Sequence, residues 1–404
     1  MFFSSAALAE ERSIFTDPED GALDMSEWLL DKKGFLPVPI IVTEPAIGYG
    51  GGLALLWFRE SLGERRAQGR LSPPDIFGGA LAATENGTTL AGGFGLVTFG
   101  QENWRWRGFI GRPDVNLDFY GAGGDLGTGQ HHVGYNLEGW ATTQHLLRRI
   151  GDSDNWVGVR WNYLDFNARF DSSRPQPIAQ GVREIQSSGF GVFLEHDSRD
   201  NFFTPSRGWK GYVESAFYSP DFGGEAKYQT YRANAFGYVP MSKALILGGR
   251  IDARAARGDV PFYQLPFIEM RGIPFFRYQD ENVGLVEAEL RWNVTPRWAL
   301  VGFAGTGRTW GTSKSFSDAD SASSWGLGFR RLMARRLGIY MGIDIARGPE
   351  ETAFYIQAGS AWRRARVRIS RSSLAGRSTS SSCARACSSR PPTWSGGASA
   401  RSLP

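Results

Sequence analysis

The strand-length segment that ends at Trp292 has two faces of opposite chemistry. Its apolar and ionisable residues alternate strictly: Val286, Ala288, Leu290 and Trp292 against Glu287, Glu289 and Arg291. Because successive side chains of a β-strand point to opposite faces, one face is apolar and the other is charged. A soluble sandwich would bury the apolar face in its core. A membrane barrel would turn it to lipid and turn the charges to the lumen. The rest of the chain decides between these folds.

The same alternation recurs along most of the chain. Fifteen strand-length segments, separated by Gly, Pro, Asn and Asp, begin near residues 47, 75, 88, 103, 132, 155, 183, 208, 226, 243, 282, 297, 322, 336 and 351. One more is expected at Ile40–Thr43 or between Asp114 and Gly121. Soluble sandwiches rarely keep polar inner faces beside apolar outer faces over so many segments. Since single-chain bacterial barrels have even strand numbers, we predict an all-β fold, a transmembrane antiparallel β-barrel of about 16 strands, or about 14, over residues 37–362.

Composition agrees with a barrel and sets the ends of the chain apart. No window contains the roughly 20 consecutive apolar residues that a spanning helix needs. The net charge of the whole chain is +4. Residues 363–404 hold nine Arg and no Asp, Glu or Lys, so residues 1–362 carry a net charge of 4 − 9 = −5. This balance gives no support for a nucleic-acid partner. The same 363–404 segment holds both cysteines, shows no sustained alternation, and is predicted to be a disordered Arg/Ser-rich tail, with a frameshift as one origin.

The N-terminal residues are predicted to precede the barrel. Residues 1–9 resemble the end of a truncated signal peptide, because Ala7-Leu8-Ala9 is a small-x-small cleavage pattern. Residues 10–36 are expected to form a periplasmic segment with one short helix from Leu23 to Lys33, which Gly34 would stop. At the other end of the barrel, Trp362 closes the last segment, as Trp57, Trp292 and Trp310 close theirs, in the manner of aromatic interface girdles.

Three local patterns resemble the BamA/TamA family of outer-membrane proteins, also called bacterial surface antigens. The first, DSRDNFFTPSRGW, is similar to a periplasmic turn of the family and supplies Asp197, Arg199, Asn201, Pro205 and Gly208. The second, MRGIPFFRY from Met270, is similar to the Arg-Gly-aromatic motif on the loop that folds back into the barrel, with Ile273 at a usually aromatic position. The third is the set of closing strands, VGFAGTGRTW, WGLGFRR, GIYMGIDIARG and FYIQAGSAW, in which Gly305 stands where the family often carries Asp.

The resemblance covers about residues 37–362 and implies a Gram-negative outer-membrane barrel without the periplasmic POTRA repeats that receive clients. The family inserts or translocates proteins at the outer membrane. The resemblance therefore implies outer-membrane lipid as a partner, a polypeptide or lipid client, and a separate periplasmic partner in place of the repeats.

The Arg-Gly pair of the second motif suggests a lock inside the lumen. An arginine on an inward loop must be paired, because a buried unpaired charge is costly. We predict that Arg271 pairs with Glu289 or Glu287 on the next strand, that Asp344 is a further acceptor, and that Arg291 and Arg330 balance the acid. The alternative is ordinary lumenal charges in water. Gly272 is expected to serve a close backbone approach or a positive φ.

Three functions are compatible with these observations, and none is catalytic. The four histidines are scattered, so no catalytic, cofactor-binding or metal site is predicted. An assembly-type barrel would pass a client through a weak seam, placed between the Gly-rich first strand with Gly48, Gly50 and Gly52 and the end of the barrel with Gly359 and Trp362. A passive porin-like channel would use a charged lumenal face, which consists of Arg250, Asp252, Arg254, Glu287 and Glu289. A structural surface antigen would show neither activity.

Overall fold

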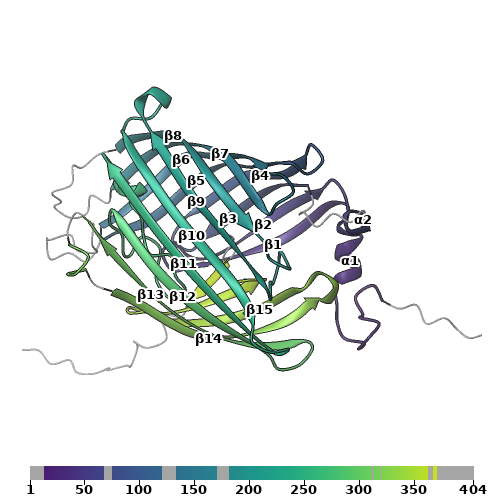
Figure 1. The fold of residues 1–404 in the computed structure, drawn as a ribbon. Helices are drawn as coiled ribbons and strands as arrows, with labels where there is room; N and C mark the ends of the chain where they lie inside the picture. Colours follow the sequence, from purple (N-terminus) through teal and green to yellow (C-terminus); the bar gives the residue numbers. More distant parts are fainter. Residues whose placement is uncertain are drawn as a thin grey trace, which may run out of the picture. The chain divides into compact units, whose positions relative to one another are not determined.

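The computed structural model describes residues 13–67, 75–120, 133–170, 182–311, 314–319, 321–362 and 367–370, all within one compact unit, residues 1–372. Each strand pairs antiparallel with the next along the chain, and the sheet curls into a nearly closed barrel (Figure 1). The strands are β1 Gly34–Glu44, β2 Gly48–Phe58, β3 Ile76–Thr84, β4 Thr89–Phe99, β5 Trp104–Phe119, β6 Val133–Arg149, β7 Asn155–Phe170, β8 Val182–Asp197, β9 Gly208–Tyr218, β10 Tyr228–Pro240, β11 Leu245–Gly258, β12 Asn282–Asn293, β13 Trp298–Trp310, β14 Ser321–Ala334, β15 Ile339–Arg347, β16 Thr352–Ala358 and β17 Val367–Ser370. The helices are α1 Ser26–Leu30 and α2 Leu62–Ala67. No helix of the described residues is long and apolar enough to cross a membrane.

The strands β1 to β16 form the barrel wall and confirm the predicted number. All fifteen expected segments are present as β2 to β16, and the additional one lies at the N-terminal alternative, as β1. The barrel thus begins at Gly34 and not at Pro37. The other alternative, after Asp114, is the continuation of β5. The short strand β17 pairs with β16 and falls within the predicted tail; the rest of that tail and residues 1–12, with the expected signal peptide, lie outside the described residues.

The apolar side chains of the wall point outward, as a membrane barrel requires. The outward side chains of Leu81, Val213 and Leu327 are 65%, 61% and 66% exposed, whereas the inward carboxylates of Asp252 and Asp344 are buried. This arrangement is opposite to a soluble sandwich, where the apolar face would be covered and the charges would meet water. The two-faced strands of the sequence are therefore membrane strands.

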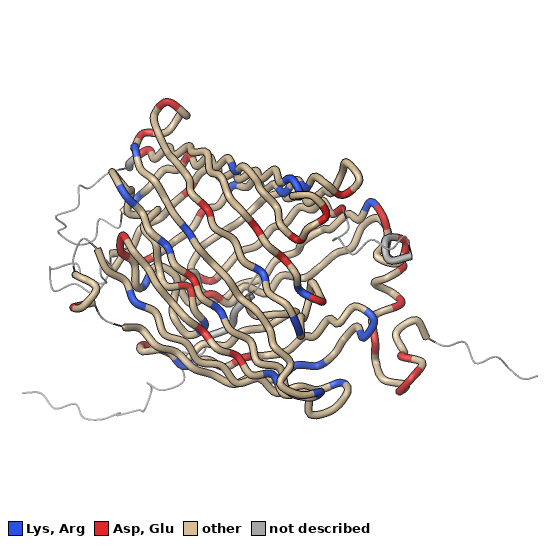
Figure 2. The backbone as a smooth tube through the Cα atoms, in the orientation of Figure 1, with Lys and Arg blue, Asp and Glu red and all other residues tan. Residues whose placement is uncertain are grey.

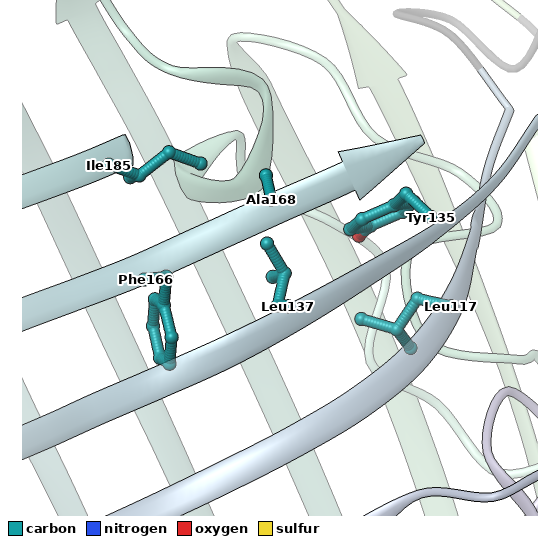
Figure 3. Packing of buried hydrophobic residues seen from close by; sticks show 6 residues of the cluster. All are labelled: Leu117, Tyr135, Leu137, Phe166, Ala168 and Ile185. Atoms are coloured by element: carbon teal, nitrogen blue, oxygen red, sulfur yellow. The ribbon is translucent and has the colours of Figure 1, made fainter. Parts of the chain in front are cut away.

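The polarity reverses at the loop end of β5 to β8, where the strands are longest. Their inward residues form an apolar cluster (Figure 3) of Leu117, Tyr135, Leu137, Phe166, Ala168 and Ile185. On the outward face of the same region, Glu138 pairs with Arg112 and Arg169, each at 3.0 Å. Apolar inside and charged outside is the pattern of a water-exposed sheet. These strands therefore extend beyond the lipid, and their ends form a small core above it.

The strands β1 to β4 have an apolar inner face as well as an apolar outer face. Glu44, at the end of β1, is the only charged residue in these four strands. On the inner face, Leu90 pairs with Ala82 and Phe94 pairs with Gly78, and both large side chains are 38% exposed. The polar inner face that recurs in the later segments is therefore not found in this part of the wall. Lumenal charge is concentrated in the later strands.

The N-terminal segment, residues 13–33, is held against two short turns of the barrel. Arg297, in the turn between β12 and β13, donates from Nε to Asp20 at 2.8 Å and from Nη1 to Asp24 at 2.5 Å, and also binds Asp17. Arg335, after β14, binds Asp17 and Asp20, and both signs of charge gather where the segment meets the barrel (Figure 2). The helix in this segment is α1, which is shorter than the Leu23–Lys33 prediction; at its start, Leu23 forms a β-bridge with Thr16 and Asp24 binds Arg297.

The predicted aromatic girdle holds for three of its four members, since Trp310 has the parity of the outward Trp298 on β13. Trp57 and Trp292 are outward and 37% and 51% exposed, as expected at a membrane interface. Trp362 instead turns into the barrel, where it is buried against Phe236, Tyr238 and Ile246. Its position after β16 does not mark the outer surface, because the chain folds inward once the last full strand ends.

Candidate functional site: a loop anchored in the lumen

The connection between β11 and β12, residues 259–281, folds into the barrel and is called the lumenal loop here. Its residues Ile268, Met270 and Ile273 are buried and pack on Val283 and Leu285 of the wall. Ile273 thus fills, with an aliphatic side chain, the position where the family motif has an aromatic one. Apolar packing therefore holds the loop in addition to the predicted ion pairs of Arg271. The loop backbone directs the side chains of both Ile268 and Met270 toward β12.

Arg271 is the central charge of the loop and is completely buried. Its Nη1 donates to Asp344 Oδ2 at 3.0 Å, and its Nη2 lies 2.7 Å from Glu289 Oε2. Arg271 Nη2 and Glu289 Oε2 form an ion pair but not a hydrogen bond, because the N–H does not point at the carboxylate oxygen. The guanidinium carbon also lies 3.4 Å from the centre of the Phe303 ring. Two carboxylates and an aromatic face therefore surround this one cation.

Arg330 completes the cluster as the second cation. It donates to both carboxylate oxygens of Asp344, at 2.6 and 2.9 Å. Arg271 and Arg330 thus balance Glu289 and Asp344 in charge, as a buried cluster requires, since an uncompensated buried charge is strongly destabilising. Asp344 is the shared acceptor that joins the loop to β14 and β15.

Two of the predicted charges have other partners. Glu287 does not contact Arg271; it accepts from Nη1 of Arg250 at 2.6 Å. Arg291 points away from the cluster, toward the turn between β8 and β9, and donates to Pro205 O at 3.2 Å and Ser206 Oγ at 2.7 Å. The inward residues of β12 are therefore divided along the strand: Glu287 and Glu289 face the loop, and Arg291 faces the opposite end of the barrel.

The course of the loop explains why glycine is found at position 272 in the loop and at position 305 on the facing strand β13. Gly272 has φ +86°, and its N–H donates to Tyr355 Oη at 2.5 Å. A Cβ on Gly305 would lie 2.8 Å from Met270 Sδ and 2.7 Å from Glu287 Cγ. The departure at Gly305 thus makes room for the loop, and Asp344 on β15 supplies a carboxylate to Arg271.

Several contacts of the loop were not anticipated. Glu269 pairs with Arg254 at 2.6 Å, and its carbonyl accepts from Arg250 at 3.0 Å. Asp252 accepts from three arginines, Arg232, Arg250 and Arg254. Glu269 lies two residues before Arg271, but strand periodicity does not predict which side of the lumen a loop residue faces. Only the fold brings Glu269 to β11.

The predicted periplasmic turn between β8 and β9 is an ordered structure at the short-turn end. Arg199 makes a two-pronged pair with Asp197, at 2.7 and 2.8 Å. Asn201 donates to Leu337 O at 3.0 Å, which joins this turn to the one between β14 and β15. Gly208 has φ +87°, and a Cβ there would lie 2.2 Å from Ser198 O. Pro205, whose carbonyl accepts from Arg291, connects the turn to the inner face of β12.

Comparison with solved structures identifies the architecture. The BamA barrel of Haemophilus ducreyi, solved without POTRA domains 1–3, has a TM-score of 0.55 with 12% sequence identity, over 81% of this chain and 70% of that one. CdiB from Escherichia coli has a TM-score of 0.53 with 11% identity, over 80% of this chain and 62% of that one. CdiB from Acinetobacter baumannii has a TM-score of 0.50 with 12% identity, over 78% and 56%.

The fold is that of BamA and CdiB. The predicted resemblance to BamA/TamA barrels is confirmed at this level. By sequence, no protein-family model and no curated protein matches the chain. The chain spans less than two thirds of the two CdiB proteins.

The seam of this BamA-like barrel is not where the sequence suggested. Gly48, Gly50 and Gly52 lie in β2, whose two edges pair with β1 and β3. Gly50 serves close strand approach, since a Cβ there would lie 2.0 Å from Ala83 O. Gly359, with φ +80°, follows β16 and turns the chain toward the buried Trp362. The open edge instead belongs to β1, which lies beside β16 and β17.

Among the described strands, no ladder of hydrogen bonds joins β1 to β16 or β17. The β1–β2 register is continuous from Gly34 to Glu44. Pro37 and Pro39 share the same parity, so both withhold an N–H from the same edge of β1. Because β1 is paired with β2 along its whole length, the edge that lacks the N–H groups of Pro37 and Pro39 is the edge away from β2. This edge faces the seam, which is the boundary between β1 and β16–β17.

Proposed function

We propose that this chain is an outer-membrane barrel of a Gram-negative bacterium that acts in outer-membrane biogenesis, by passing a polypeptide or lipid client through the seam. The carrying observation is the edge of β1, which has its β2 partner on one side and no ladder on the other among the described strands. Pro37 and Pro39 remove two N–H donors from this edge, but its C=O acceptors remain, and a strand edge with free backbone groups is a template for adding another strand. The proposal assigns no catalytic step to the chain.

Two further observations support this proposal. The strands β1 to β4, next to the seam, are apolar on both faces up to Glu44 at the end of β1, so that an apolar client segment would meet no buried charge along the rest of them. The BamA and CdiB barrels, with which the chain shares its fold, favour an outer-membrane setting. A separate periplasmic partner that delivers the client belongs to the same proposal.

A reversible cross-link across the seam tests the proposal. Cysteines would replace Val38 or Ile40 on β1 and Gln357 on β16, in a background in which Cys383 and Cys387 are serine. A short bis-methanethiosulfonate, which forms a reducible disulfide with each cysteine and releases methanesulfinate, would join each pair. The readout is the rate at which the barrel, in lipid vesicles, accelerates insertion of a urea-unfolded eight-stranded outer-membrane barrel protein. We expect the acceleration to fall at least about fivefold on cross-linking and to return on reduction.

The matched control joins strands that are already paired. Val38 and Ala54 are register partners on β1 and β2, so cysteines at these positions restrain β1 without closing the seam. This cross-link should leave the rate unchanged. If the seam cross-link has no effect on a measurable acceleration, or if the β1–β2 cross-link slows insertion equally, the seam does not carry the activity. If vesicles with and without the barrel insert the probe at the same rate, the insertion role itself is wrong.

A passive channel is the second candidate, because the later strands carry the lumenal charges of Arg250, Asp252 and Arg254. The lumenal loop argues against an open pore. It contacts β11 through Glu269, β5 through the packing of Phe262 on Phe119, and β1 through Phe275 N–H to Glu44 Oε1 at 3.3 Å. We expect small, flickering conductance in planar bilayers. A large, steady conductance would favour the channel over the seam proposal, and a surface antigen would show neither conductance nor insertion.

A further inference from the structure

A long apolar groove runs across the outward face of β8 to β13, on strands far from the seam in the barrel order. It consists of three adjoining hollows of about 590, 410 and 390 Å³. All three meet at Ala233, and two of them also meet at Ala253 and Trp310. Most outward side chains around them are apolar, with Asn155 and His196 at the short-turn end as exceptions, so that the groove fits hydrocarbon chains.

The strand register explains why the wall is hollow here. Ala233, Ala253 and Gly284 are consecutive partners on β10, β11 and β12, so three small residues lie side by side across the wall. The neighbouring outward row toward the short turns contains Ile251 and Val286, which are partners as well. The side chains of Ile251 and Val286 project from the wall on the short-turn side of the small residues, and aromatic side chains project on the loop side. The row of small residues is therefore the floor of a channel between them.

The aromatic row lies at the loop end and leads to two arginines. Tyr231 and Trp310 border the groove there, as aromatic residues do at a membrane interface. Arg308 on β13 is the register partner of Gly284, so it follows the small residues in the same row across the wall. Arg257 lies at the loop end of β11 and donates to Asn282 Oδ1 at 2.6 Å, while Asn282 donates to Trp310 O at 3.0 Å.

Both guanidinium groups lack an acidic partner among the described residues. Arg308 donates to Ser321 Oγ and Phe316 O, and Arg257 donates to Ala256 O and Asn282 Oδ1. The nearby carboxylates of Asp280 and Glu281 lie against Gly311, on the loop side. Most arginines of the lumen, by contrast, are paired with carboxylates. Two outward cations at the end of a hydrocarbon groove complement an anionic lipid head group.

We propose that this groove binds a phosphorylated glycolipid of the outer leaflet, the lipid A part of lipopolysaccharide. Its acyl chains lie along Ala233, Ala253 and Gly284, and its phosphates contact Arg257 and Arg308. These arginines are on β11 and β13, two strand spacings or about 10 Å apart across the wall. Arg308 shares its row with Ala253, so Arg257 lies four residues or about 13 Å further along the strands, and the two Cα atoms are about 16 Å apart. This separation favours a head group with two separate phosphates over a phospholipid with one, and guanidinium groups bind phosphate in a directed, two-pronged manner.

Native mass spectrometry of the full chain in detergent, titrated with diphosphorylated lipid A or with phosphatidylglycerol, tests this site. The double variant Arg257→Gln/Arg308→Gln removes the cations, and Ala253→Phe fills the groove but keeps both arginines. Arg347→Gln is the matched control, because Arg347 is also exposed near the loop end and bonds only Thr352 Oγ1, at 3.2 Å, among the described residues. Heat-dependent gel mobility verifies that each variant is folded.

We expect one tightly bound lipid A on the unmodified chain and at least about tenfold weaker binding by the double variant, as the loss of two charge-assisted contacts implies. Ala253→Phe should weaken binding as well, and Arg347→Gln should not. Equal binding by the double variant and the unmodified chain would overturn the proposal. So would an equal loss in Arg347→Gln, which would indicate general surface charge, or equal affinity for phosphatidylglycerol, which would remove the assignment to lipid A.

Discussion

Replacing Arg271 by methionine should destabilise the barrel through the carboxylate that it leaves behind. Methionine keeps an unbranched apolar stem of similar length but removes the charge. Asp344 retains Arg330 at 2.6 Å, whereas Glu289 loses its ion-pair partner at 2.7 Å and is 9% exposed. Breaking a buried pair costs about 3–5 kcal/mol, and only one of the two carboxylates is left unpaired, so we expect about 3 kcal/mol.

A second substitution turns this expectation into a sharp test. If the loss comes from the unpaired carboxylate, Arg271→Met/Glu289→Gln should be more stable than Arg271→Met by about 1–2 kcal/mol, although it carries one more substitution. Packing of the lumenal loop alone would make the double variant equal to or weaker than the single one. The sign of this difference separates the two explanations.

The assay is the temperature at which the folded, fast-migrating form of the barrel converts to the unfolded form on a detergent gel. A loss of about 3 kcal/mol corresponds to a fall of about 5 °C for a chain of this size. Arg347→Met, at an exposed outward position, is the control and should change stability by less than about 0.5 kcal/mol. An unchanged midpoint for Arg271→Met, or a double variant no more stable than the single one, would refute the lock.

Three other predictions follow from individual contacts. The hydrogen bond from Arg297 lowers the pKa of Asp20; burial opposes the shift at Asp24, but hydrogen bonds from Ser26 and Arg297 still hold its pKa below the ordinary value. A carboxylate whose pKa is lowered in the folded state adds stability at pH values above its unfolded pKa of about 3.9, and this stability is lost as the pH falls through the lowered pKa. The N-terminal segment should therefore stay attached at neutral pH and detach in acid. Protease cleavage within residues 13–33 measures the detachment. The Arg297→Gln variant should be cleaved at neutral pH as well, and a pH-independent rate would contradict the role of these carboxylates. Arg291→Ala should increase hydrogen exchange in the turn of residues 198–207 but leave the lumenal loop unchanged, because its hydrogen bonds go to Pro205 O and Ser206 Oγ. Gly272→Ala should cost about 1–3 kcal/mol in the gel assay, because its φ is +86° and a Cβ would lie 3.1 Å from Gly348 N; the control Gly151→Ala has φ +57° with open space and should cost less, and equal losses would show that the approach to Gly348 is unimportant.

Strand periodicity was sufficient to predict the barrel, because the direction of a side chain in a strand depends only on its parity. It located β2 to β16 to within a few residues and placed Glu289 and Asp344 on the inner face. It did not separate Glu287 from Glu289 as the partner of Arg271, since both have the same parity. That choice depends on the height at which the lumenal loop crosses β12, which only the packing of Ile268, Met270 and Ile273 determines.

The ends of the wall depend still more on tertiary structure. The sequence suggested the Gly-rich β2 as the first strand and gave Ile40–Thr43, now part of β1, only as one of two places for an additional strand. In the barrel, β1 needs hydrogen bonds on the β2 side alone, so that proline is acceptable on its other edge. Local alternation thus determined that this chain is a membrane barrel with a charged inner face on its later strands. Closure of the sheet, which brings residues hundreds of positions apart into contact, decided where its seam lies and which carboxylates hold its loop.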